Sequence, residues 1–270
     1  MTDLSIVIPL YNEERSLPPL WSELRVVLEH LGLAFEVVFV DNGSHDRSAD
    51  IIRTFCEMDR RVRLVRIGTN AGETAATDAG FKAVRGANVV VMDADLHNDP
   101  ADIPRLLAHL QRWDAATGWR PDRAAGTNLV GQVSAWIADG LRNTLSGATI
   151  YDDGCNFHAF RRQCLRELVL YRGFHRFIPT LLEMRGYRVV EVPVGHRPRR
   201  YRPWHHGSPH RLLGELIDLL MIRWMRRRLL RYEIAEDVGG LSPVDLREPH
   251  GRRRKHYADS CVLPDQPRAR

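Results

Sequence analysis

Long apolar runs are absent from the 270-residue chain. Its most apolar stretch, residues 216–225, contains Asp218 and Arg223 and is shorter than the ~20 apolar residues that a membrane-spanning helix needs. Cysteine is scarce as well: the four cysteines form no Cys-x-x-Cys pair, which favours reduced structural thiols in a cytosolic protein. The first residues enter a strand pattern without the basic segment of a secretory signal. We therefore expect a soluble or peripheral protein.

The composition is that of a globular protein, but its charge is uneven. Hydrophobic residues make up 44% and charged residues 27%, which argues against wholesale disorder and against a coiled coil. Residues 196–232 hold ten arginines and two acidic residues, so this segment carries +8 whereas the whole chain carries +5. The rest of the chain is therefore slightly acidic. Such a basic segment indicates an anionic surface or an anionic ligand at that end.

The first half of the sequence alternates between two periodic patterns. Continuous apolar runs predict buried strands at residues 4–10, 35–41, 62–67 and 88–93. Between them, helical spacing predicts helices over residues 14–30, from Asp46 or Ser48 onward, and over 73–84. This alternation predicts a mostly parallel α/β sheet with helices on both faces, whose ligand lies beyond the carboxyl ends of the strands.

The pattern changes after about residue 118. Helical spacing appears at 127–145, a strand pattern at 187–194, a Pro/His/Arg-rich loop at 196–210, and a basic amphipathic helix at 211–232. From residue 233 to 270 the chain is polar and without periodicity. We expect one domain over residues 1–232 and a disordered tail over 233–270.

Two polar motifs follow predicted strands. Asp93-Ala94-Asp95-Leu96-His97 places two carboxylates where a chain leaves the sheet, and these could hold a divalent cation and a diphosphate. Asp41, followed by Asn42 and Gly43, could accept hydrogen bonds from a base or ribose. Each motif alone also fits an ordinary turn or a helix start. Together, at one edge of one sheet, they are far more specific.

Eight motifs in order resemble one enzyme family. They are IVIPLYNEE (6–14), VDNGSHDRS (40–48), NAGETAATDAGFKAVRG (70–86), VVMDADLHNDP (90–100), GWRPDR (118–123), DDGCNFHAFRR (152–162), FHRFIP (174–179) and VVEVPVGHRPR (189–199). The chain resembles the family-two glycosyltransferases and, among them, the polyprenyl-phosphate sugar transferases of the dolichol-phosphate mannosyltransferase and undecaprenyl-phosphate types. The resemblance covers roughly residues 4–230 and implies a GT-A nucleotide-diphospho-sugar transferase fold.

The resemblance also implies a donor site. The nucleotide-sugar-binding positions of the family match Pro9, Tyr11, Glu13, Asp41, Asn70, Gly72 and Asp93. A divalent cation, Mg²⁺ or Mn²⁺, would be bound by Asp93, Asp95 and His97. His97 stands where the family more often has Gln, and imidazole suits Mn²⁺ better than Mg²⁺.

The acceptor in the family is a polyprenyl phosphate. Its phosphate is anionic at neutral pH because its second pKa is near ~6, so alignment and neutralisation matter more than a general base. The resemblance gives catalytic roles to Asp95, Arg120 and Asp152, with Asp152 positioning rather than deprotonating. The acceptor-phosphate contacts match Arg120, Arg123, Ser134 and Arg199. The transfer would invert the anomeric carbon at the cytoplasmic face of the membrane, where the basic helix either lies on anionic lipid or packs on the domain.

Some positions depart from the family pattern. Residues 129–134 contain no arginine, the usual lysine after His-Arg-Pro-Arg is replaced by a segment with His205 and His206, and Asn42 replaces an Asp. Two other functions therefore stay open: a GT-A glycosyltransferase with a soluble acceptor, and a non-catalytic scaffold or partner binder. We rank the non-catalytic alternative, including a nucleic-acid role, last because Asp93 and Asp95 are both present.

Overall fold

The computed structural model describes residues 2–121, 150, 152, 155–166, 168–197 and 209–230. The chain divides into two units, residues 1–228 and 229–270, and the first unit contains every described helix and strand. The predicted helix over 127–145 and the predicted tail over 233–270 lie outside the described residues.

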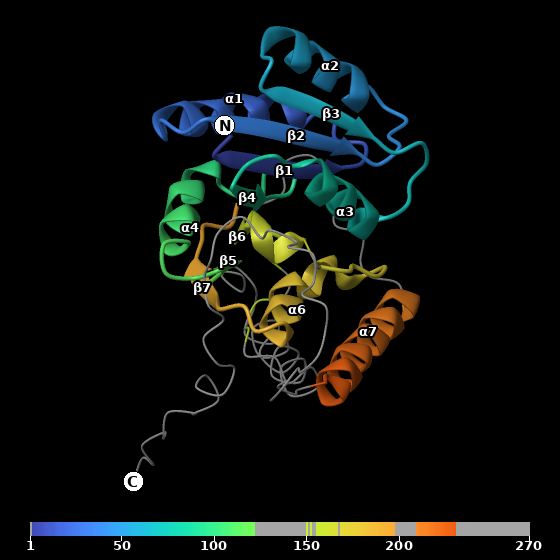
Figure 1. Cartoon of the computed structure of the whole chain (residues 1–270). Helices are drawn as coiled ribbons and strands as arrows, with labels where there is room; N and C mark the ends of the chain where they lie inside the picture. Colours follow the sequence, from blue (N-terminus) through green and yellow to red (C-terminus); the bar gives the residue numbers. More distant parts are fainter. Residues whose placement is uncertain are drawn as a thin grey trace, which may run out of the picture. The chain divides into compact units, whose positions relative to one another are not determined.

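The described strands form one sheet of mixed direction in the order β3-β2-β1-β4-β6-β5-β7 (Figure 1). Strands β1, β2, β3 and β4 pair parallel, whereas β6 pairs antiparallel with both β4 and β5, and β7 pairs parallel with β5. The strand bounds are β1 Leu4–Leu10, β2 Phe35–Asp41, β3 Val62–Arg66, β4 Asn88–Val91, β5 Ala115–Trp119, β6 His158–Arg161 and β7 Val189–Pro193. The predicted mostly parallel α/β sheet is confirmed.

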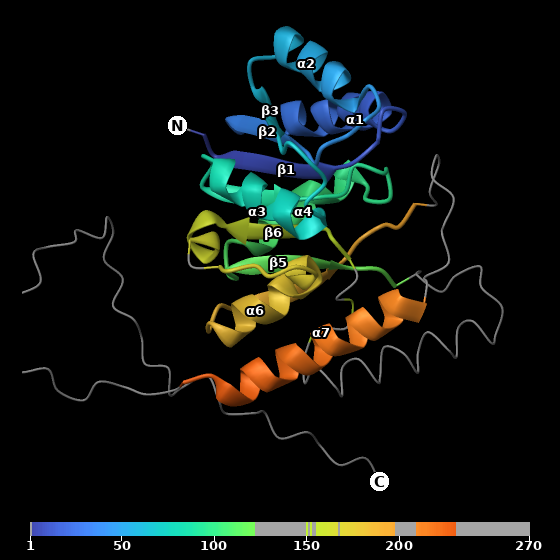
Figure 2. The ribbon, with the colours of Figure 1, turned by 90° about the vertical axis from the view of Figure 1, so that its right-hand side faces the viewer.

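Helices cover both faces of this sheet (Figure 2). Side chains alternate along each strand, so that Ile6 and Ile8 pack with one set of helices while Val7 packs with the other. The first set is α1 (Leu17–His30), α2 (Ser48–Met58) and α4 (Ile103–His109). The second set is α3 (Glu73–Ala83) and α6 (Ile178–Met184). Short 3₁₀ turns lie at Pro100–Asp102, Arg162–Leu165 and Phe174–Phe177.

The last described helix, α7, runs from Pro209 to Arg228 rather than over the predicted 211–232. Leu219 and Ile222 on its inner face are buried against Phe174, Phe177 and Leu181, and Figure 2 shows α7 next to α6. No helix among the described residues combines the length and apolarity that crossing a bilayer demands.

Candidate active site

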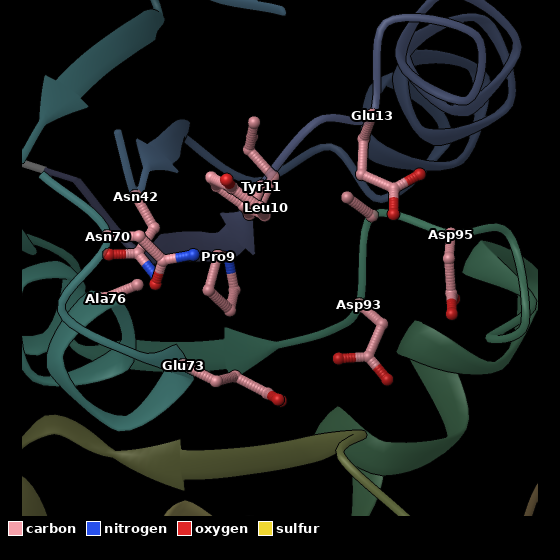
Figure 3. Close-up of a pocket in the computed structure, with 11 residues that line it drawn as sticks. Pro9, Leu10, Tyr11, Glu13, Asn42, Asn70, Glu73, Ala76, Asp93 and Asp95 are labelled. Atoms are coloured by element: carbon pink, nitrogen blue, oxygen red, sulfur yellow. The ribbon is translucent and has the colours of Figure 1, made fainter. Parts of the chain in front are cut away.

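A pocket of about 240 Å³ opens where β1, β2 and β4 end (Figure 3). Because these strands are parallel, their carboxyl ends share one edge of the sheet, which is where the sequence predicted a site. The pocket is lined by Pro9, Leu10, Tyr11, Glu13, Asn42, Asn70, Glu73, Ala76, Asp93, Ala94 and Asp95. Six of the predicted site residues are therefore brought together: Pro9, Tyr11, Glu13, Asn70, Asp93 and Asp95.

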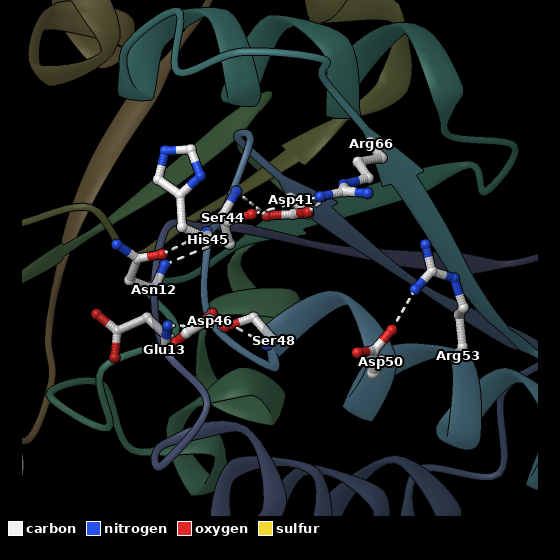
Figure 4. A network of polar contacts seen from close by, with 10 residues as sticks. All are labelled: Asn12, Glu13, Asp41, Ser44, His45, Asp46, Ser48, Asp50, Arg53 and Arg66. Atoms are coloured by element: carbon white, nitrogen blue, oxygen red, sulfur yellow. Dashed lines mark hydrogen bonds and ion pairs between the residues drawn. The ribbon is translucent and has the colours of Figure 1, made fainter.

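Asp41, at the end of β2, does not line this pocket. Its carboxylate is fully buried, accepting hydrogen bonds from Ser44 N at 2.9 Å and from Arg66 Nε at 3.0 Å (Figure 4). The neighbouring Asn42 reaches the pocket instead. Its Nδ2 donates to Asn70 Oδ1 and its Oδ1 accepts from Ala71 N, both at 3.0 Å. Asp41 thus braces the loop, while Asn42 faces the ligand side.

Two further loops are bonded to each other beside this pocket (Figure 4). Asn12, with a positive φ of 56°, donates from its backbone N to Ser44 Oγ, and its Oδ1 accepts from His45 N. Glu13 N donates to Ser48 Oγ at 2.9 Å, which holds the pocket-lining Glu13 near the start of α2. Asp46, predicted as a possible helix cap, accepts from Ser48 N at 3.0 Å.

Gly43 and Gly72 shape the loops without lining the pocket. Both have a positive φ, 75° and 91° respectively, a conformation that favours glycine. A Cβ on Gly43 would also lie 2.8 Å from Asn70 N, so only glycine lets β2 end this close to the Asn70 loop. Gly72 precedes the first residue of α3, Glu73.

Asp93 and Asp95 follow β4, which ends at Val91 rather than at the predicted residue 93. Asp93 Oδ1 accepts from Asn156 Nδ2 at 2.7 Å, and its backbone N donates to Asn98 Oδ1. Burial raises the pKa of Asp93 well above its usual range, and the nearby charges of Glu73 and Asp95 raise it further. A divalent cation would relieve this repulsion, so the carboxylate set fits such a cation.

The predicted third metal ligand, His97, is oriented differently. Among the described residues no three His, Cys, Asp or Glu side chains gather in a group that could hold a metal ion. The Nε2 atom of His97 lies 3.7 Å from Asp95 Oδ2, and its ring stacks on His196 at 4.8 Å between centroids. Two carboxylates without a full protein cage are what Mg²⁺ uses when substrate phosphates complete its shell.

Arg120 and Asp152 form a bidentate ion pair. Arg120 Nε and Nη2 donate to the two oxygens of Asp152 at 2.8 Å each, and Arg120 N donates to Asp152 Oδ2 at 3.1 Å. Burial lowers the pKa of Arg120, but the hydrogen bonds and charge of Asp152 outweigh it and raise that pKa. Asp152 therefore orients a permanently charged guanidinium. Arg123, Ser134, Arg199, His205 and His206 lie outside the described residues.

Sequence reasoning missed three polar side chains that complete the site. Glu73 lines the pocket, Asn156 bonds to both Glu73 and Asp93, and His175 lies 3.4 Å from Glu73. All three fall inside motifs that carry the family resemblance, and that was their only signal. Their partnership spans separations of 83 and 102 residues in the chain, which local patterns do not report.

A seven-stranded α/β sheet with paired carboxylates at this edge defines a GT-A nucleotide-diphospho-sugar transferase fold. The model of glycosyl transferase family 2 matches residues 5–169. A structure of glucosyl-3-phosphoglycerate synthase from Mycobacterium tuberculosis with Mn²⁺, uridine diphosphate and phosphoglyceric acid superposes with a TM-score of 0.61 at 20% identity, covering 85% of this chain and 80% of that one. The chain belongs to glycosyl transferase family 2, and the predicted family and fold are confirmed.

Curated relatives are more similar in sequence. The chain is 31% identical over 230 residues to a dodecaprenyl-phosphate galacturonate synthase of Rhizobium johnstonii, with 83% of this chain and 68% of that protein covered. It is 36% identical over 225 residues to an undecaprenyl-phosphate 4-deoxy-4-formamido-L-arabinose transferase of Pseudomonas aeruginosa, with 80% and 64% covered. The chain thus spans about two thirds of the length of these relatives.

Proposed function

We propose that the protein transfers a sugar from a nucleotide-diphosphate sugar to a polyprenyl phosphate with inversion at the anomeric carbon. The observation that carries this proposal is the placement of Asp93 and Asp95 in a pocket at the carboxyl edge of the sheet. Two relatives above 30% identity are named for transfer to a polyprenyl phosphate. Their names differ in the sugar, so they leave the donor sugar of this chain open.

The donor would lie along the pocket. The Asn42 and Asn70 end offers amide donors and acceptors to a base or ribose, and Asp93 and Asp95 would bind Mg²⁺ or Mn²⁺ at the other end. Such a cation, when bound, neutralises the leaving nucleotide diphosphate. The chain's own contribution there is to hold Asp93 in place through Asn156 and to keep Glu13 beside it.

The acceptor phosphate would be held by Arg120. Two of its donors are committed to Asp152, and Nη1 makes no hydrogen bond with the described residues. A fixed guanidinium aligns an anionic phosphate oxygen for in-line attack. The bond from the anomeric carbon to that oxygen forms as the bond to the diphosphate breaks, and the electron pair leaves with the nucleotide. No general base is needed because the phosphate is already ionised.

Helix α7 supports a peripheral position at the inner membrane face, next to the lipid acceptor. Its outer side exposes Ile217, Leu220, Met221 and Trp224, each by 45–61%. Arg227 and Arg228 are exposed on the same helix. An apolar stripe beside arginines fits an anionic lipid surface, where the apolar side chains enter and the cations meet the headgroups.

A transfer assay tests the proposed function. Radiolabelled UDP- and GDP-sugars are incubated with the protein, undecaprenyl phosphate and Mn²⁺, and label in the organic phase is counted. We expect lipid-dependent transfer that falls at least about 100-fold in Asp95→Asn, because the substitution removes a carboxylate charge that would bind the cation. Asp50→Asn on the exposed side of α2 is the matched control and should retain the rate.

Two results would contradict the proposal, and each would favour one of the two alternative functions. Sugar transfer to a water-soluble acceptor without lipid would replace the proposal with a soluble-acceptor glycosyltransferase. Failure of every UDP- and GDP-sugar to bind would replace it with a non-catalytic scaffold.

A further inference from the structure

Glu73 is a carboxylate in the pocket that the proposed reaction does not use. It is the first residue of α3 and lines the pocket near Asp93 (Figure 3). Its side chain is 49% exposed, so part of the carboxylate stays open to a ligand.

Contacts from two other segments hold this carboxylate in place. Asn156 Nδ2 donates to Glu73 Oε1 at 3.1 Å and to Asp93 Oδ1 at 2.7 Å, so one amide orients both acids. On the other side, His175 Nε2 lies 3.4 Å from Glu73 Oε2. Glu73 therefore keeps a fixed place relative to Asp93.

The imidazole of His175 is itself oriented by Thr74. Gly173 N donates to Thr74 Oγ1 at 3.0 Å, and Thr74 Oγ1 lies 2.8 Å from His175 Nδ1. When the Thr74 hydroxyl donates to Nδ1, the ring proton sits on Nε2 and faces the Glu73 carboxylate. With this assignment, each group in the series donates a hydrogen bond to the next one: Gly173 N to Thr74, Thr74 to His175, and His175 to Glu73. The network ends on Glu73, which accepts from both neighbours.

The pocket is otherwise acidic. Its described lining includes Glu13, Glu73, Asp93 and Asp95 and contains no Lys, Arg or His. Arg120 acts on Asp93 from nearby, but its charge is matched by the bidentate pair with Asp152. A cation bound by Asp93 and Asp95 would face the diphosphate. Glu13 is buried, and its carboxylate accepts a hydrogen bond from Ser16 Oγ at 2.7 Å. Glu73, whose side chain is 49% exposed, is therefore the acidic group that the sugar part of the donor would meet.

We propose that Glu73 selects the donor sugar by charge. It accepts hydrogen bonds from hydroxyl or amino groups of a neutral or amino sugar, and it repels the carboxylate of a uronic acid. This inference rests on the proposed function, since it concerns the sugar of the same nucleotide donor. It narrows the donor class to nucleotide-linked neutral or amino sugars.

Matched donor pairs test the selection. Binding is measured by calorimetric titration in Mn²⁺ for UDP-glucose against UDP-glucuronate, UDP-galactose against UDP-galacturonate, and GDP-mannose against GDP-mannuronate. The members of each pair differ only at C6, where the neutral sugar has a hydroxymethyl group and the uronate has a carboxylate. We expect the neutral member of the bound pair to bind about tenfold more tightly, and Glu73→Gln to reduce that ratio to about twofold by improving uronate binding.

Asp78→Asn is the control, since it removes one charge from the same helix outside the pocket, where Asp78 pairs with Lys82. It should keep the wild-type ratio. Uronates that bind the wild type as tightly as the neutral sugars would overturn the inference, and so would a Glu73→Gln ratio equal to that of the wild type. If neither UDP, GDP nor any of the six sugars binds, the proposed function itself fails.

Discussion

At the scale of single residues, burial keeps the imidazole of His158 neutral at pH values where a histidine in water would be protonated. His158, on β6, is fully buried with Nδ1 2.8 Å from Thr117 Oγ1. Burial lowers the pKa of His158 from 6.5 to about 3. The folded state keeps the ring neutral, whereas the unfolded chain takes up a proton below about pH 6.5. Folding stability is therefore present above that pH and is lost as the pH falls toward 3.

A substitution at His158 isolates this effect. Between pH 6 and pH 4 we expect the wild type to lose about 1.4 kcal/mol of unfolding free energy per pH unit more than His158→Gln. Urea unfolding at pH 6.0, 5.0 and 4.0 measures the difference, and His30→Gln at the exposed end of α1 should show the wild-type slope. Parallel slopes in wild type and His158→Gln would contradict the buried neutral ring.

At the scale of elements, the pocket depends on how closely α3 approaches the sheet. Gly80 faces β1, and a Cβ there would lie 2.3 Å from Val7 Cγ1. Gly214 in α7 has no atom within 4 Å of its Cβ position. Substitution by alanine should therefore change the unfolding free energy in opposite directions at these two glycines. At Gly80 the added Cβ creates a clash, whereas at Gly214 it only increases the helix propensity.

We expect Gly80→Ala to lower the unfolding free energy by about 2 kcal/mol. Gly214→Ala should raise it by about 0.5 to 1 kcal/mol. Guanidinium unfolding followed by circular dichroism measures both. If Gly80→Ala left the unfolding free energy unchanged, α3 could shift on the sheet without cost. That result would contradict a fixed position of Glu73.

At the scale of the whole molecule, the inner side of α7 packs on the 3₁₀ turn at Phe174–Phe177 and on α6, while its outer side is apolar and exposed. We expect the protein to bind vesicles with 30% anionic lipid and to bind neutral vesicles weakly, with 0.5 M salt weakening the binding. The double variant Ile217→Ser and Trp224→Ser should weaken anionic vesicle binding by about tenfold or more, since two apolar anchors are lost.

Cosedimentation with vesicles measures this binding. Val26→Ser removes an apolar side chain of similar exposure, 56%, from α1 and should not change it. Equal binding to neutral and anionic vesicles, or binding that the double variant retains, would contradict a role for α7 at the membrane.

Patterns within short stretches of the sequence determined the first half of the fold. The predicted strands at 4–10 and 35–41 have those bounds in the structure, because continuous apolar runs are buried wherever the sheet forms. The strands β5 and β6 were not predicted. They have five and four residues, and β6 is a strand only because β4 and β5 supply its partners on both sides.

The sequence by itself determined the family, the parallel sheet and the carboxylates Asp93 and Asp95, since each depends on residues close together in the chain. Only the tertiary structure decided which polar groups line the pocket. In the structure Asp41 pairs with Arg66, and Asn42 lines the pocket instead. Asn156 and His175, which are 83 and 102 residues away from Glu73 in the sequence, both contact its carboxylate. Hydrogen bonds between distant segments form only after folding has brought donor and acceptor to about 3 Å from each other, and no local pattern encodes that approach.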